Sequence, residues 1–60
     1  MNGKTYSGWL GDFLEVDDDT ESGELSLYVY SQDSTVELPI HEVKKLIEDL
    51  TVWVSKKERE

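Results

Sequence analysis

The chain has 60 residues, no cysteine and a formal net charge of −8, from 14 acidic and 6 basic residues. This length predicts a single small domain over residues 1–60, and the lack of cysteine excludes disulfides, thiolate zinc sites and cysteine nucleophiles. Direct binding to nucleic acid or to an anionic membrane is not expected, because both need basic patches. A disulfide-free chain with no apolar leader and no membrane-spanning run is expected to be cytoplasmic.

The first two thirds of the chain alternate apolar and polar residues with the two-residue period of β-strands. Glycines at 8 and 11 predict a bulge or a tight turn after the first strand, and Gly23 supplies the flexible position of a later turn. The predicted strands lie in residues 4–10 (KTYSGWL), 13–16 (FLEV), 24–31 (ELSLYVYS) and 35–38 (TVEL).

From Ile40 the apolar residues recur at three- and four-residue steps, which predicts an amphipathic α-helix. Pro39 suits the helix start, and Glu42 in the first turn complements the helix dipole. We expect Lys45 and Asp49 to pair on the exposed side of the helix. The helix is predicted to run to about Ser55, with a closing strand over residues 51–55 as the alternative.

These elements predict an α+β fold: a small antiparallel sheet of three to four strands, with one C-terminal helix packed on one face. We expect the apolar side chains of the strands to form a core with those of the helix. The predicted core consists of Leu14, Val16, Leu25, Leu27, Val29, Val36 and Leu38, packed against Ile40, Val43, Leu46, Ile47 and Leu50.

The opposite face of the sheet is then expected to be exposed. It would present Phe13, Tyr28 and Tyr30, with Trp9 near them and with Glu15 and Glu37 at the rim. An exposed aromatic patch of this kind is typical of a contact surface. The patch is interpreted either as a docking site for a partner protein or as a homodimer contact.

Catalytic and metal-binding motifs are lacking. His41 is the one histidine, and it falls on the side of the helix away from the apolar stripe, without a recognisable nucleophile. Residues 17–24 (DDDTESGE) fail the calcium-loop template, because Val29 stands where the bidentate glutamate belongs. We therefore predict a protein that is not an enzyme and that has no cofactor and no dedicated metal site.

The distribution of charge is the most informative feature of the sequence. Residues 5–43 contain no Lys or Arg, whereas the C-terminal segment contains most of the basic residues. Alternate side chains on one face of a strand lie about 6.6 Å apart, a spacing of the order of that between successive phosphates. A surface of this kind attracts a basic protein. The candidate partner-binding residues are Asp12, Glu15, Asp17, Asp18, Asp19, Glu21, Glu24, Asp33 and Glu37.

In its size, its lack of cysteine and this acidic stretch, the chain resembles the DNA-mimic proteins that bacteriophages make. The resemblance implies an inhibitor of a host DNA-binding protein, such as nucleoid-associated HU or RNA polymerase. The Lys-bearing helix departs from this pattern and would have to point away from the partner. The alternatives are a small adaptor or subunit that docks through Phe13, Tyr28 and Tyr30, and a domain whose charge only maintains solubility.

Overall fold

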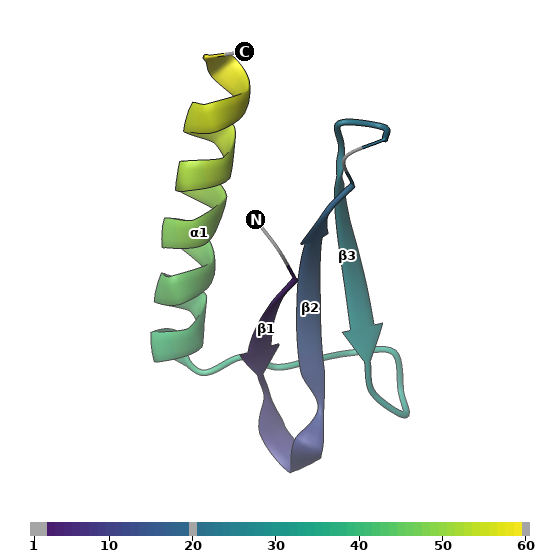
Figure 1. Ribbon diagram of the computed structural model, residues 1–60. Coiled ribbons are helices and arrows are strands. Elements are labelled where there is room, and N and C mark those ends of the chain that lie inside the picture. The colour runs from purple at the N-terminus through teal and green to yellow at the C-terminus, as the bar shows by residue number, and fades with distance from the viewer. Residues whose placement is uncertain (1–2, 20, 60) are drawn as a thin grey trace.

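The computed structural model describes residues 3–19 and 21–59 and has the predicted α+β architecture. Within this part of the chain, three antiparallel strands form a sheet in the order β1-β2-β3, and a helix follows (Figure 1). The elements are β1 (Lys4–Ser7), a 3-10 turn η1 (Trp9–Gly11), β2 (Phe13–Asp18), β3 (Leu25–Tyr30) and α1 (Ile40–Glu58).

The register gives the sheet two different faces. Residues paired directly across the strands point to the same side, and successive residues point to opposite sides. The first side, called here the helix face, contains Tyr6, Leu14, Val16, Leu27 and Val29. The second, called the free face, contains Thr5, Ser7, Phe13, Glu15, Asp17, Ser26, Tyr28 and Tyr30.

Two polar contacts attach the helix to β1. Glu42, which is only 6% exposed, accepts a 2.9 Å hydrogen bond from the backbone N–H of Ser7. The hydroxyl of Tyr6 donates to Asp49 two turns further along α1. The predicted pair of Lys45 with Asp49 is wrong, because Lys45 instead lies 2.8 Å from the Glu42 carboxylate. These contacts hold α1 over the β1 side of the sheet.

The predicted strand over residues 35–38 is wrong. A turn after β3 is closed by the N–H of Thr35, which donates to Ser31 Oγ at 2.8 Å, and the chain then crosses to the start of α1 without joining the sheet (Figure 1). Val36 and the carbonyl of Glu37 in this segment pack closely against Gly8, which has no side chain to obstruct them. The alternative of a closing strand at 51–55 is also wrong, since α1 continues through it to Glu58.

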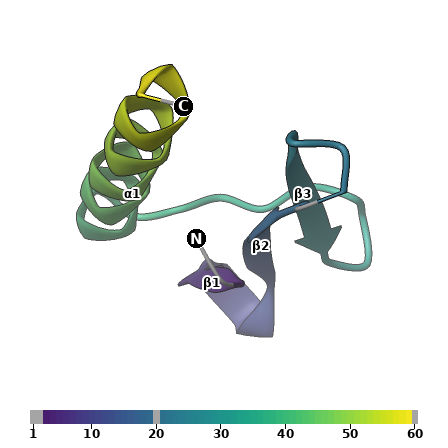
Figure 2. The same ribbon diagram turned by 45° about the horizontal axis from the view of Figure 1, so that its top comes forward.

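The core is smaller than predicted. Among the described residues, the buried hydrophobic side chains are Tyr6, which was not predicted, and Val16. The α-helix lies over β1, so β3 on the far side of the sheet receives no cover from it (Figure 2). For this reason several members of the predicted core are largely exposed to solvent: Leu27 (56%), Val29 (47%), Ile40 (73%) and Ile47 (59%).

Candidate binding surface

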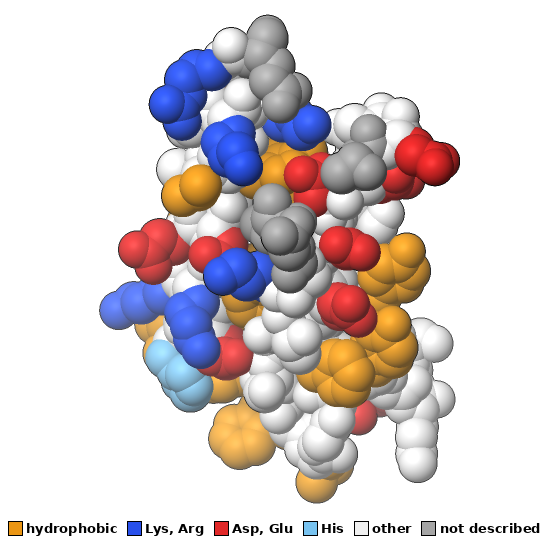
Figure 3. All heavy atoms as spheres, viewed as in Figure 1, with side chains coloured by type: hydrophobic (Ala, Val, Ile, Leu, Met, Phe, Trp, Pro, Cys, Tyr) orange, Lys and Arg blue, Asp and Glu red, His pale blue; other side chains and the backbone are white. Residues whose placement is uncertain are grey.

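The free face combines carboxylates with aromatic rings. Glu15 and Asp17 alternate along β2 on this side, and Glu15 is the direct cross-strand partner of Tyr28. Figure 3 shows acidic side chains over β2 beside a hydrophobic patch over β2 and β3, whereas most Lys and Arg side chains lie over α1. None of the strand residues on the free face is basic. Glu15 and Asp17 of the predicted acidic set therefore share one surface with the predicted aromatic residues.

The rings of the free face form a contiguous group. Phe13 and Tyr30 are stacked, with ring centroids 4.5 Å apart and an angle of 17° between the planes. Tyr28 follows, with its centroid 6.4 Å from that of Tyr30. The negative charge of the neighbouring Glu15 raises the pKa of the Tyr30 hydroxyl. Trp9 is in η1, away from this group.

This arrangement suits a cationic side chain. Tyr28 and Tyr30 are 48% and 45% exposed, so their ring surfaces are accessible to a partner. A guanidinium group can stack on an aromatic ring while its N–H groups donate to a neighbouring carboxylate. Glu15 provides that carboxylate beside Tyr28.

The acidic residues of the β2–β3 hairpin extend the negative surface at one end of the sheet. The Asp19 carboxylate accepts hydrogen bonds from the N–H groups of Glu21 (3.0 Å) and Ser22 (3.4 Å), and these lower its pKa. Asp19 therefore shapes the turn, while Glu21 and Glu24 are exposed. Asp18 is paired with Leu25 and belongs to the helix face.

Three further candidate acids lie at the other end of the sheet. Asp12, Asp33 and Glu37 line a hollow of 180 Å³ next to η1. Asp33 accepts hydrogen bonds from the Ser31 hydroxyl and the Thr35 N–H, which lower its pKa and stabilise the turn after β3. The expectation that Glu37 lies at the rim of the aromatic patch as part of a strand is wrong, because residues 35–38 do not form a strand.

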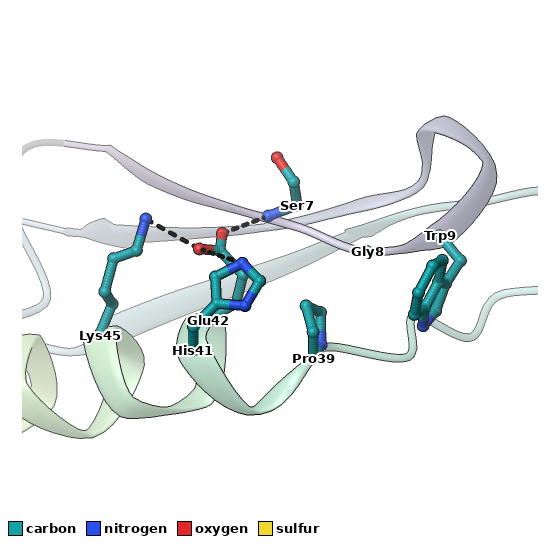
Figure 4. Close-up of a pocket in the computed structure, with 7 residues that line it drawn as sticks. All are labelled: Ser7, Gly8, Trp9, Pro39, His41, Glu42 and Lys45. Carbon is teal, nitrogen blue, oxygen red and sulfur yellow. Dashed lines mark hydrogen bonds and ion pairs between the residues drawn. The ribbon is translucent and has the colours of Figure 1, made fainter.

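A hollow of 410 Å³ lies between the end of β1 and the start of α1 (Figure 4). Its polar centre is Glu42, whose pKa is lowered by Lys45 and by the N–H of Ser7. The His41 side chain is 74% exposed and lies 3.8 Å from Glu42. The hydroxyl of Ser7 points away from His41, so the two do not form a nucleophile–base pair (Figure 4). This group attaches the helix to the sheet.

Over residues 3–19 and 21–59, no three His, Cys, Asp or Glu side chains are grouped so that they could hold a metal ion. The helix of the described chain is not apolar enough to cross a membrane. No protein family, curated protein or solved structure matches this chain.

Proposed function

We propose that this protein is a non-enzymatic DNA mimic that occupies the DNA-binding surface of a basic protein and inhibits it. The observation that carries the proposal is the free face, where Glu15 and Asp17 stand in one row beside Tyr28 and no strand residue is basic. The basic residues of the chain lie mainly on α1, which stands beside the sheet, at a distance from the rings over β3 (Figure 3).

The carboxylates favour a partner that binds DNA through Lys and Arg. Two side chains on one face of a strand lie about 6.6 Å apart, and a sheet holds them at a fixed separation, as a duplex holds its phosphates. The exposed Glu21 and Glu24 at the hairpin add charge beyond the strand. A negative field summed over these groups accelerates association with a basic surface and is weakened by salt.

The rings of the free face favour a second candidate function, that of an adaptor that docks through Phe13, Tyr28 and Tyr30. Tyr residues with accessible rings are frequent energetic centres of protein interfaces. In this case binding depends on buried area more than on charge, and it persists at high salt. The two candidates use the same surface, so salt dependence and competition with DNA separate them.

Capture from a nuclease-treated bacterial lysate, with elution by a salt gradient, tests the proposal. The bait is compared with the double variant Glu15→Gln/Asp17→Asn and with a control, Glu48→Gln/Glu58→Gln, which removes the same charge from exposed positions of α1. We expect a basic DNA-binding protein on the unmodified bait and on the control, and its loss from the free-face variant. Equal capture by all three contradicts the proposal.

A further inference from the structure

Two sets of apolar side chains are left without cover, one on the helix face of the sheet and one on α1 itself. The first is on β3, where Leu27 is 56% and Val29 is 47% exposed. The second is on α1, where Ile47 is 59% and Val54 is 45% exposed, and where these residues and Leu50 line a hollow of 420 Å³. A 60-residue chain has little apolar surface to spare, so this exposure indicates an interface.

The exposed side of α1 lies toward the uncovered half of the sheet. Glu42 contacts the N–H of Ser7 on the outer edge of β1 and thus marks the side of the helix nearest β1. Ile47 follows Glu42 by five residues, which places it about 140° around the helix. Val54, seven residues after Ile47, returns to nearly the same side. This side of α1 and the bare part of β3 therefore flank the same open region.

We propose that a second copy of the chain covers this region, with the helix faces of the two copies packed together. The two-fold axis runs parallel to the strands and lies between the sheets. Rotation about this axis turns the partner's helix face toward the first copy. It also places the partner's β3 opposite β1 of the first copy, and the partner's β1 opposite β3. Each helix α1 then lies over its own β1 and over the partner's β3. A perpendicular axis in the plane between the sheets would instead place the two helices in collision.

The positions of the exposed residues along the strand and helix axes, measured from the row of Ser7 and Glu42, agree with this packing. Glu42 is level with Ser7, and the register places Ser7, Phe13 and Tyr30 in one row across the sheet. Leu27 lies three residues from that row, or about 10 Å along the strand. The positions of Ile47 and Leu50 lie about 7.5 and 12 Å from Glu42 along the helix. Leu27 thus faces the space between the partner's Ile47 and Leu50.

Charge also favours a second copy as the occupant. The residues of β3 (Leu25–Tyr30) carry no charge, so two chains of net charge −8 meet there without direct repulsion. The C-terminal end of α1 and the β2–β3 hairpin lie at the same end of the molecule (Figure 1). An axis parallel to the strands preserves that direction, so the basic end of each helix approaches the acidic hairpin of the partner. The groups that approach are Lys56, Lys57 and Arg59 on one side and Asp19, Glu21 and Glu24 on the other.

Molar mass in solution gives the first test. Light scattering coupled to size exclusion should give about 14 kDa, twice the 6.9 kDa of one chain. Ile47→Lys should convert the protein to the monomer. Val52→Lys is the matched control, because Val52 is 57% exposed on another side of the same helix, and it should remain dimeric. A monomeric unmodified protein, or an Ile47→Lys variant that remains a dimer with unchanged circular dichroism, overturns the proposal.

Cross-linking gives a second test that does not depend on a destabilising change. Because the chain has no cysteine, single-cysteine variants report one contact each. An oxidised mixture of Leu27→Cys and Ile47→Cys should yield the mixed disulfide, identified by mass spectrometry. Replacing the second variant with Val52→Cys should reduce that product at least tenfold. Equal yields overturn the proposed packing and would favour pairing along the β3 edge or through the free face.

The dimer does not rest on the proposed function. The free face lies on the opposite side of the sheet and stays exposed in both copies, so Tyr28→Ser should leave the molar mass unchanged. Loss of the dimer in this variant would place the contact on the free face and would overturn the inference.

Discussion

The hydroxyl of Tyr6 donates a 2.5 Å hydrogen bond to the carboxylate of Asp49, joining β1 to α1 across 43 residues of sequence. Tyr6 is 2% exposed, and its pKa is raised first by burial and then by Asp49. The bond holds the helix on the sheet, where few other buried side chains contribute.

Removing this hydroxyl should destabilise the fold. We expect Tyr6→Phe to lower the free energy of unfolding by about 1.5 kcal/mol, because a hydrogen bond to a charged acceptor is lost while the ring keeps its packing. Tyr28→Phe is the control, since this ring is 48% exposed, and it should change the free energy by less than about 0.5 kcal/mol. Urea denaturation measures both. Equal effects would mean that the hydroxyl does not stabilise the contact.

The contribution of Glu42 should depend on pH. Its pKa is lowered by Lys45 and by the Ser7 N–H, so the ionised form is favoured in the folded protein. The stabilisation is present above the ordinary pKa of 4.5 and is lost as the pH falls below it. Glu42→Gln keeps an acceptor for Ser7 and removes the charge that Lys45 contacts. The difference in Tm between the two proteins should narrow from pH 6 to pH 3, as scanning calorimetry can show. A difference independent of pH contradicts this account.

Position 8 should accept no side chain. A Cβ at Gly8 would lie 2.7 Å from Val36 Cγ1 and 2.8 Å from the carbonyl oxygen of Glu37. We expect Gly8→Ala to lower the free energy of unfolding by about 1–3 kcal/mol, because the backbone of the crossing segment must move. Adding Val36→Ala should restore only part of the loss, since the carbonyl contact remains. Full recovery in the double variant would show that the methyl contact alone sets the cost.

The rings and carboxylates of the free face should act differently on binding to a captured partner. Tyr28→Ser/Tyr30→Ser should weaken affinity about three- to tenfold at every salt concentration, because ring contacts with cationic groups are poorly screened once they are desolvated. Glu15→Gln/Asp17→Asn should instead reduce the dependence of affinity on salt. Calorimetric titrations at several NaCl concentrations measure both effects. Binding that persists at high salt, is unchanged in the carboxylate variant and is lost in the tyrosine variant would support the adaptor function.

The local patterns of the sequence predicted much of the fold. Alternation in residues 24–31 gave β3 and placed Tyr28 and Tyr30 on one side, because a strand fixes the side of each residue. The three- and four-residue period gave α1. The same rule placed Glu15 beside the rings, so the main residues of the free face were predictable.

What the sequence could not provide was the position of the helix across the sheet. This position depends on contacts between distant residues, namely Tyr6 with Asp49 and Glu42 with Ser7, and periodicity carries no information about them. The predicted core assumed a centred helix, and Leu27 and Ile47 are exposed because α1 lies to one side. Residues 35–38 alternate like a strand, yet they cross between elements.

Competition with DNA tests the central claim most directly. A captured partner is bound to fluorescent duplex DNA, and this protein is added while the anisotropy is recorded. The account predicts complete release of the DNA, with a reduced effect for Glu15→Gln/Asp17→Asn and no reduction for Glu48→Gln/Glu58→Gln. A partner that holds the DNA and this protein at the same time would contradict DNA mimicry.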